Sequence, residues 1–171
     1  SSPVSFLSYE YYLRRADEYF ESGNYLRAGL FYRLAIRLNP SFTKTYFNLA
    51  YLYEQQNKFN KMYEVFEIFV KSFRPISAED YFILGYAYFR LKDYEQAETY
   101  YHIAKQKAYG KNKARIISEL GRIYDRRKHI EQDNELKEKF NKLALEAFKK
   151  AVDLDKESFN AHYNLGKYYF T

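Results

Sequence analysis

The stretch that decides the fold is YFILGYAYFRLKDYEQAETYYHIAK, residues 81–105. Its apolar residues recur every three or four positions, which is the spacing of an amphipathic helix and not of a strand. Two helical faces follow one another across a short polar break: Tyr81, Leu84, Gly85 and Tyr88, then Ala97, Tyr101 and Ala104. The segment therefore predicts two antiparallel helices joined by a tight turn.

Gly85 lies inside a strong helical pattern, where glycine costs about 1 kcal/mol relative to alanine. We therefore expect a packing reason for it, since small residues let two helices approach closely. A small residue recurs at the same place of the same face at Ala16, Ala50, Gly85, Gly121 and Gly166. The intervals between these residues are 34, 35, 36 and 45 positions. The pattern indicates an internal repeat.

The composition favours a helical protein throughout. Only three prolines and six glycines interrupt the 171 residues, and no apolar run is long enough to span a membrane. The absence of cysteine excludes disulfides and thiolate metal sites, and the first residues show no signal-peptide pattern. We expect a soluble, all-α protein that forms one domain or one compact array. The sequence does not fix whether it is cytoplasmic or periplasmic.

The repeat resembles the tetratricopeptide repeat (TPR) family, whose pattern is W-x2-L-G-x2-Y followed by A-x3-F with a period of about 34 residues. The third copy carries the clearest match, which is Tyr81-x2-Leu84-Gly85-x2-Tyr88 and then Ala97-x3-Tyr101. Arg15 and Met62 depart from the pattern, and the chain has no tryptophan. The resemblance nevertheless extends over four and a half copies, from about residue 9 to residue 171.

The resemblance implies a right-handed superhelical array of antiparallel helix pairs, a TPR solenoid. The expected parts are a leader or helix start (1–8), four repeats (9–42, 43–77, 78–111 and 112–157) and the first helix of a truncated fifth repeat (158–171). We favour excision from a longer protein as the reason for the incomplete fifth repeat, with self-association through this uncapped helix as the alternative.

The fourth repeat carries an insertion of about eleven residues near 128–138, because nineteen residues separate Tyr124 from Ala144 where the other repeats have eight. Helical spacing continues through the insertion, so we expect lengthened helices with a turn near 128–134. Two interpretations stay open: a simple length change, or a projection that docks a second partner.

The resemblance further implies that the first helix of each pair lines a concave groove. Carried over to this sequence, the binding positions that we favour are Phe47, Tyr51, Phe82, Tyr86, Phe89, Arg90, Arg115, Arg122 and Arg126. Aromatic residues and arginine are common at interface hot spots, and Phe82, Tyr86 and Phe89 are not needed for the expected stacking. The alternative is that these rings pack on a second helix or on one another.

Some members of the family hold the carboxylate ends of chaperones with a lysine and asparagine clamp. The equivalent places here are Leu13 and Asp17, or Phe47 and Tyr51 one repeat further on. The clamp is therefore absent, and we predict that the protein is not a co-chaperone of that type.

The sequence predicts a non-catalytic scaffold that binds a peptide or helix of a partner protein, possibly an acidic one, in the groove and helps to assemble a multiprotein complex. No catalytic, cofactor or metal motif is recognisable. Residues 105–150 contain fourteen Lys or Arg against seven Asp or Glu, so nucleic-acid binding through this segment is the alternative function. A third hypothesis is a regulatory module fused to a catalytic domain outside this segment.

Overall fold

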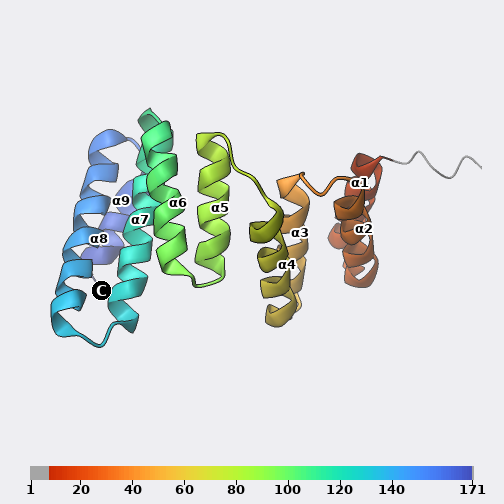
Figure 1. Cartoon of the computed structure of the whole chain (residues 1–171), viewed down its shortest axis with the longest axis horizontal. Helices are drawn as coiled ribbons and strands as arrows, with labels where there is room; N and C mark the ends of the chain where they lie inside the picture. The colour runs from red at the N-terminus through yellow and green to blue at the C-terminus, as the bar shows by residue number, and fades with distance from the viewer. Residues whose placement is uncertain (1–7, 171) are drawn as a thin grey trace, which may run out of the picture. The chain divides into compact units, whose positions relative to one another are not determined.

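The computed structural model describes residues 8–170, so residues 1–7 of the expected leader and Thr171 lie outside it. The described residues are all-α, as predicted, and contain no strand (Figure 1). The helices are α1 (Tyr9–Glu21), α2 (Tyr25–Leu38), α3 (Thr43–Gln55), α4 (Phe59–Ser72), α5 (Ala78–Arg90), α6 (Tyr94–Lys107), α7 (Gly110–Ile130), α8 (Asn134–Leu154) and α9 (Phe159–Tyr169).

Three of the helix pairs reverse direction through the same main-chain turn. Its central residue has a positive φ of 79° at Gly23, 58° at Asn57 and 62° at Lys92. The N–H of the following residue bonds back across the turn, as from Asp93 to the carbonyl of Tyr88 at 3.0 Å. This is the Schellman pattern that ends many helices, and it returns the chain sharply enough for two neighbouring helices to pack.

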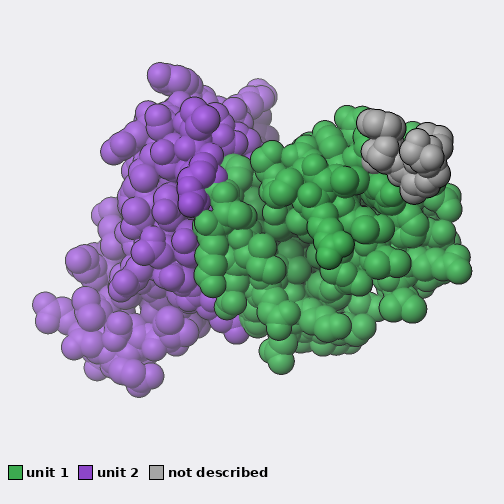
Figure 2. Space-filling model, turned by 45° about the vertical axis from the view of Figure 1, so that its right-hand side comes forward, with its two compact units in different colours: residues 1–73 green, residues 74–171 purple. Residues whose placement is uncertain are grey.

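The helices gather into two compact units, residues 1–73 and residues 74–171, which are coloured separately in Figure 2. Unit 1 contains α1–α4 and unit 2 contains α5–α9. The division falls at the non-helical segment between α4 and α5, where Pro75 lacks the backbone N–H that a continuing helix would need.

The core of unit 1 is rich in aromatic rings. Phe69 is 1% exposed and packs against Tyr46, Phe47 and Phe73, with ring centroids 4.8–5.4 Å apart. The small residues at the repeat positions, such as Ala16, are fully buried. The rings therefore fill the space between helices, while the small residues let the helices approach.

Close packing at the repeated small residue is clearest in unit 2. A Cβ atom added to Gly85 would lie 2.5 Å from the ring of Tyr101, and one added to Gly121 would lie 2.6 Å from the ring of Phe148. Both rings are almost fully buried. Each ring belongs to the second helix of the same pair, so the glycine provides the space into which its partner helix places a ring.

The extra residues of the fourth repeat lie in two long helices, because α7 and α8 each have 21 residues where the other paired helices have 13 or 14. Their connection is short. Glu131 accepts hydrogen bonds from the N–H groups of Gln132 and Asp133, and the Asp133 side chain caps α8 by accepting from the N–H of Leu136 at 2.9 Å. Local side-chain bonds thus replace the left-handed turn of the shorter pairs.

Candidate functional site

A polar groove of about 550 Å³ lies between α7 and α9 of unit 2. From α7 its wall includes Arg115, Ser118, Glu119 and Arg122, and from α9 it includes Asn160, Tyr163 and Asn164. Ser118 is largely buried and accepts a hydrogen bond from the Asn164 amide at 2.8 Å, which joins the two walls. Tyr163 is 56% exposed, so much of its side chain is accessible on the wall of the groove.

Four cations follow one face of α7, and we call them the basic stripe: Lys111, Arg115, Arg122 and Arg126. All four are exposed. At 3.6 residues per turn their directions around the helix axis differ by at most about 60°. The four cations therefore lie along one face of α7, where Lys111, Arg115 and Arg122 line the groove and Arg126 lies one turn beyond it.

Arg115 is held in place by a ring and a carboxylate of α5. Its guanidinium lies 4.4 Å from the centroid of the Phe82 ring and forms an ion pair with Glu79 at 2.8 Å. The ring of Phe82 also stacks on Tyr101, with ring centroids 5.4 Å apart. The side chain of Arg115 is still 49% exposed, so part of its guanidinium faces solvent.

Arg122 repeats this arrangement two helical turns further along α7. Its guanidinium lies 5.4 Å from the centroid of the Phe89 ring and pairs with Glu119 at 3.1 Å. Phe89 also packs against Tyr94, with centroids 5.8 Å apart. Of the two interpretations left open for Phe82 and Phe89, a binding surface or packing on a second helix, the structure shows contacts of the second kind, since both rings pack on α6.

The remaining predicted positions on α5 lie close to these rings. Arg90 donates a hydrogen bond to the Tyr86 hydroxyl at 3.2 Å, and both side chains are half-buried. Burial raises the pKa of the neighbouring Tyr101, and the charge of Glu119 raises it further. The tyrosine side chains beside Phe82 and Phe89 are therefore uncharged. The positive charge of this surface lies on the arginines.

Phe47 and Tyr51 lie in unit 1. Phe47 packs against Phe66 and Phe69 in the core, with ring centroids 5.7 and 5.3 Å away. Tyr51 is 52% exposed and lies beside Phe20. It borders a hollow of about 150 Å³ whose other lining residues are Asp17, Phe20, Tyr32 and Asn48. Tyr51 is thus available on the surface of unit 1, whereas Phe47 serves mainly in packing.

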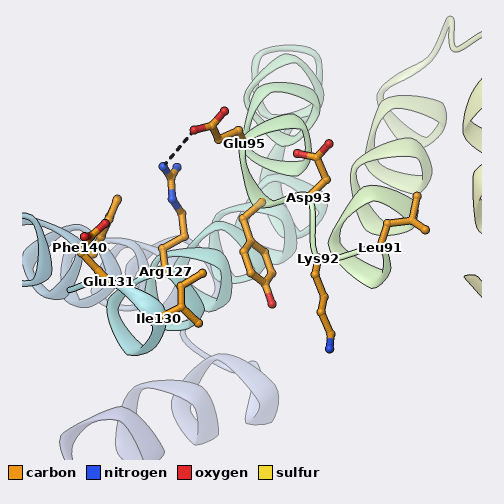
Figure 3. A pocket seen from close by; sticks show the side chains of 9 residues that line it. Leu91, Lys92, Asp93, Glu95, Arg127, Ile130, Glu131 and Phe140 are labelled. Atoms are coloured by element: carbon orange, nitrogen blue, oxygen red, sulfur yellow. Dashed lines mark ion pairs between the residues drawn. The ribbon is translucent and has the colours of Figure 1, made fainter. Parts of the chain in front are cut away.

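A second hollow of about 490 Å³ lies where the α5–α6 turn faces the end of α7 (Figure 3). Figure 3 shows Arg127 reaching toward Glu95, at 3.9 Å, and Arg127 also pairs with Glu98 at 2.7 Å. Glu98 accepts from the Tyr124 hydroxyl at 2.8 Å. Hydrogen bonding by His102, and then by Tyr124, lowers the pKa of the Glu98 carboxyl. Together these ion pairs and hydrogen bonds form a polar network that joins α6 to α7.

Several groove residues were missed by sequence reasoning. Ser118, Asn160 and Asn164 are short polar side chains within helices, and such residues are more often simple surface positions. No signal along the sequence indicates that these side chains of α7 and α9 line one groove. Among residues 8–170 no group of three or more His, Asp or Glu side chains is arranged to hold a metal ion.

The small-residue packing and the paired helices define a helical-repeat protein. Models of the tetratricopeptide repeat match residues 9–42, 47–112 and 141–171, which together make up most of the chain. The chain therefore belongs to the tetratricopeptide repeat family, as the resemblance indicated. Proteins of this family are typically non-catalytic, and the chain is a scaffold of the kind used for protein–protein interaction.

Solved structures of other proteins share this fold. A MamA protein is 22% identical, with a TM-score of 0.61 over 95% of this chain and 81% of that one. PilF of Pseudomonas aeruginosa is 19% identical, with a TM-score of 0.61 over 95% and 68% of the two chains. YrrB, described as a TPR protein with an unusual peptide-binding site, is 19% identical, with a TM-score of 0.56 over 93% and 75%. At these identities the likeness shows the fold alone.

A comparison with curated protein sequences gave no significant match. Within residues 8–170, none of the helices combines the length and the apolar character that crossing a membrane requires.

Proposed function

We propose that unit 2 binds a segment of a partner protein in the groove between α7 and α9, and that this contact helps to assemble a multiprotein complex. The observation that carries the proposal is the open groove of about 550 Å³ with exposed arginine, tyrosine and amide groups on its walls. Arginine and tyrosine are enriched at interface hot spots because they bury much area while retaining a polar end.

The groove chemistry suits a polypeptide. Arg115, Arg122 and the Asn160 amide offer hydrogen-bond donors, which carbonyl and carboxylate oxygens of a bound chain would accept. Tyr163 supplies a ring on the opposite wall, beside Phe159 at a centroid distance of 6.0 Å. Such a mixture of few rings and several fixed polar groups orients a ligand as well as holding it.

Site-specific photocrosslinking tests this proposal. A photoreactive amino acid is placed at Tyr163, and as a matched control at Lys139, which is exposed on α8 away from the groove. In the native host we expect one protein to crosslink at position 163 and not at 139, and mass spectrometry then locates its bound segment. The purified segment should bind the wild-type chain and lose affinity for an Asn160→Ala/Tyr163→Ala variant. Equal crosslinking at both positions would contradict groove binding.

Nucleic-acid binding through 105–150 remains the second candidate, and one observation favours it. Burial, and then the charges of Lys150 of α8 and Lys113 of α7, lower the pKa of Lys105 of α6, so all three lysines contribute to the potential around Lys105. Such a cluster would suit phosphate groups, whose binding weakens steeply with salt. Single-stranded RNA should then lose affinity when Lys113 and Lys150 become glutamine, and unchanged affinity would exclude this surface.

A further inference from the structure

The hollow beside Tyr51 in unit 1 combines one carboxylate with aromatic walls. Asp17 and Phe20 of α1 line it, together with Tyr32 of α2 and with Asn48 and Tyr51 of α3. The rings of Phe20 and Tyr51 are tilted by 40°, with centroids 5.7 Å apart. Tyr51 is 52% exposed, so the hollow opens at the surface of this unit. The site belongs to unit 1 alone and does not depend on the α7–α9 groove.

The carboxylate of Asp17 is held by two neutral donors. The Tyr32 hydroxyl donates to its Oδ1 at 2.5 Å, and the Asn48 amide donates to the same oxygen at 3.5 Å. Burial, and then the hydrogen bond and the charge of Asp17, raise the pKa of Tyr32, so the hydroxyl keeps its proton and remains a donor. Neither contact uses Oδ2. A carboxylate oxygen can accept two hydrogen bonds, so Oδ2 is left to accept from an occupant of the hollow.

The negative charge of Asp17 is not neutralised within the described chain. Among residues 8–170 no ion pair involves Asp17, and its neighbour Arg15 pairs instead with Glu18 at 2.7 Å. Lys44 of α3 is exposed and takes part in none of these pairs. Glu21, one turn after Asp17, acts on the same tyrosine hydroxyl with a second negative charge. Charge complementarity therefore favours a cationic occupant.

The size and the hydrogen bonding of the hollow select among cations. At about 150 Å³ it is smaller than the roughly 300–1,000 Å³ of pockets that hold drug-sized ligands, so it suits the end of one side chain. A guanidinium binds a carboxylate best through both oxygens, whereas a compact ammonium needs only one. Because Oδ1 of Asp17 already accepts two bonds, the site suits an ammonium. The rings on the walls add attraction for a cation that lies over a ring face within about 6 Å of its centroid.

We propose that this hollow binds the ammonium group of a single lysine side chain of a partner protein. The ammonium donates to Oδ2 of Asp17 and lies against the rings of Phe20 and Tyr51. The four-carbon stem of lysine is long and flexible enough for the partner's main chain to stay outside the hollow. Trimethylation of the lysine would remove all three N–H donors, so the unmodified side chain is the preferred ligand.

NMR titration of the full chain tests the proposal. The probe is N-acetyl-lysine methylamide, and the matched control is N-acetyl-norleucine methylamide, which keeps the stem and lacks the charge. The reporter is the side-chain amide of Asn48, observed at equal ionic strength. We expect saturable shifts with the lysine probe and about tenfold weaker binding of the norleucine compound, since a hydrogen bond to a charged group is lost. The trimethyl-lysine and arginine analogues should both bind less tightly than lysine.

Variants of the chain locate the site. Asp17→Asn keeps the shape of the side chain and removes its charge, so lysine binding should weaken about tenfold. Glu21→Gln removes the same charge from an exposed position one turn away and should change the affinity by about twofold or less. Tyr51→Ala should weaken binding about threefold, the size of an exposed cation–π contact. Far-UV circular dichroism checks folding, and Tyr51→Ala, which alters an exposed ring, carries the test if Asp17→Asn does not fold.

Several outcomes would overturn the lysine site. They are equal affinity for the lysine and norleucine probes, equal losses in Asp17→Asn and Glu21→Gln, and the absence of any saturable shift. Tighter binding of the trimethyl-lysine analogue would assign the hollow to quaternary ammonium groups, and tighter binding of the arginine analogue would assign it to a guanidinium. Each of these results leaves the α7–α9 groove untouched, because crosslinking at Tyr163 tests that groove separately.

Discussion

The Gly121→Ala substitution is the most direct perturbation of the packing on which the repeat depends. The added methyl group would lie 2.6, 2.8 and 2.9 Å from three atoms of the Phe148 ring. Phe148 is only 3% exposed, and its ring also packs against Tyr168 at a centroid distance of 5.4 Å. The ring therefore has little room to withdraw, and α7 and α8 must separate or distort.

Two opposing terms set the magnitude. Overpacking a well-filled core costs typically about 1–3 kcal/mol. Alanine in a helix interior is favoured over glycine by about 1 kcal/mol, which offsets part of that cost. Three contacts below 3.0 Å with a buried ring place this site in the upper part of the overpacking range, about 2–3 kcal/mol. We therefore expect Gly121→Ala to lower the free energy of unfolding by about 1–2 kcal/mol.

Gly166→Ala is the matched control, because nothing lies within 4 Å of the Cβ position there. Only the helix-propensity term remains, so this variant should be unchanged or more stable by up to about 1 kcal/mol. The assay is urea unfolding followed by far-UV circular dichroism, with the slope of the transition compared among the three proteins. If Gly121→Ala proved as stable as wild type, or if both variants lost stability equally, the packing argument would be refuted.

Three further predictions concern the network, the groove wall and α9. Because folding lowers the pKa of Glu98, this carboxylate stabilises the fold above its unfolded pKa of about 4.3, and the stabilisation is lost as pH falls through the folded value. Between pH 6 and pH 3 the melting temperature should therefore decline less for Glu98→Gln than for the wild-type protein. Phe82→Ala removes the ring between Tyr101 and an arginine, so it should cost about 2 kcal/mol in urea unfolding, below the range for a fully buried ring. If α9 mediates self-association, replacing the exposed Tyr169 and Phe170 by glutamate should convert dimer to monomer in analytical ultracentrifugation; a wild-type chain that sediments as a monomer at all concentrations would reject it.

The sequence was sufficient for the helices and their pairing because both depend on local spacing. Apolar residues three and four apart define a helical face, and the glycine inside the 81–105 segment required a close neighbour, which proved to be Tyr101. The division into two units was not foreseeable in the same way. It depends on the tertiary contacts within each unit, and no local pattern encodes those.

The groove was predictable in outline and not in detail. Family positions placed Phe82, Phe89, Arg115 and Arg122 on first helices, but the stacking of each arginine on a ring depends on the distance between α5 and α7. The hydrogen bond between Asn164 and Ser118 likewise joins residues 46 positions apart. Such contacts arise from tertiary packing, so a pattern along the chain cannot specify them.

The left-handed turns of the three shorter pairs have a practical consequence for protein engineering. Main-chain hydrogen bonds close all three reversals, and the side chain at the central position is exposed at both Asn57 and Lys92. A reporter dye or an epitope attached there would sit at the tip of its hairpin, outside the residues that line the α7–α9 groove. Each tip is thus a natural attachment point for following the protein in cells without touching its candidate binding surface.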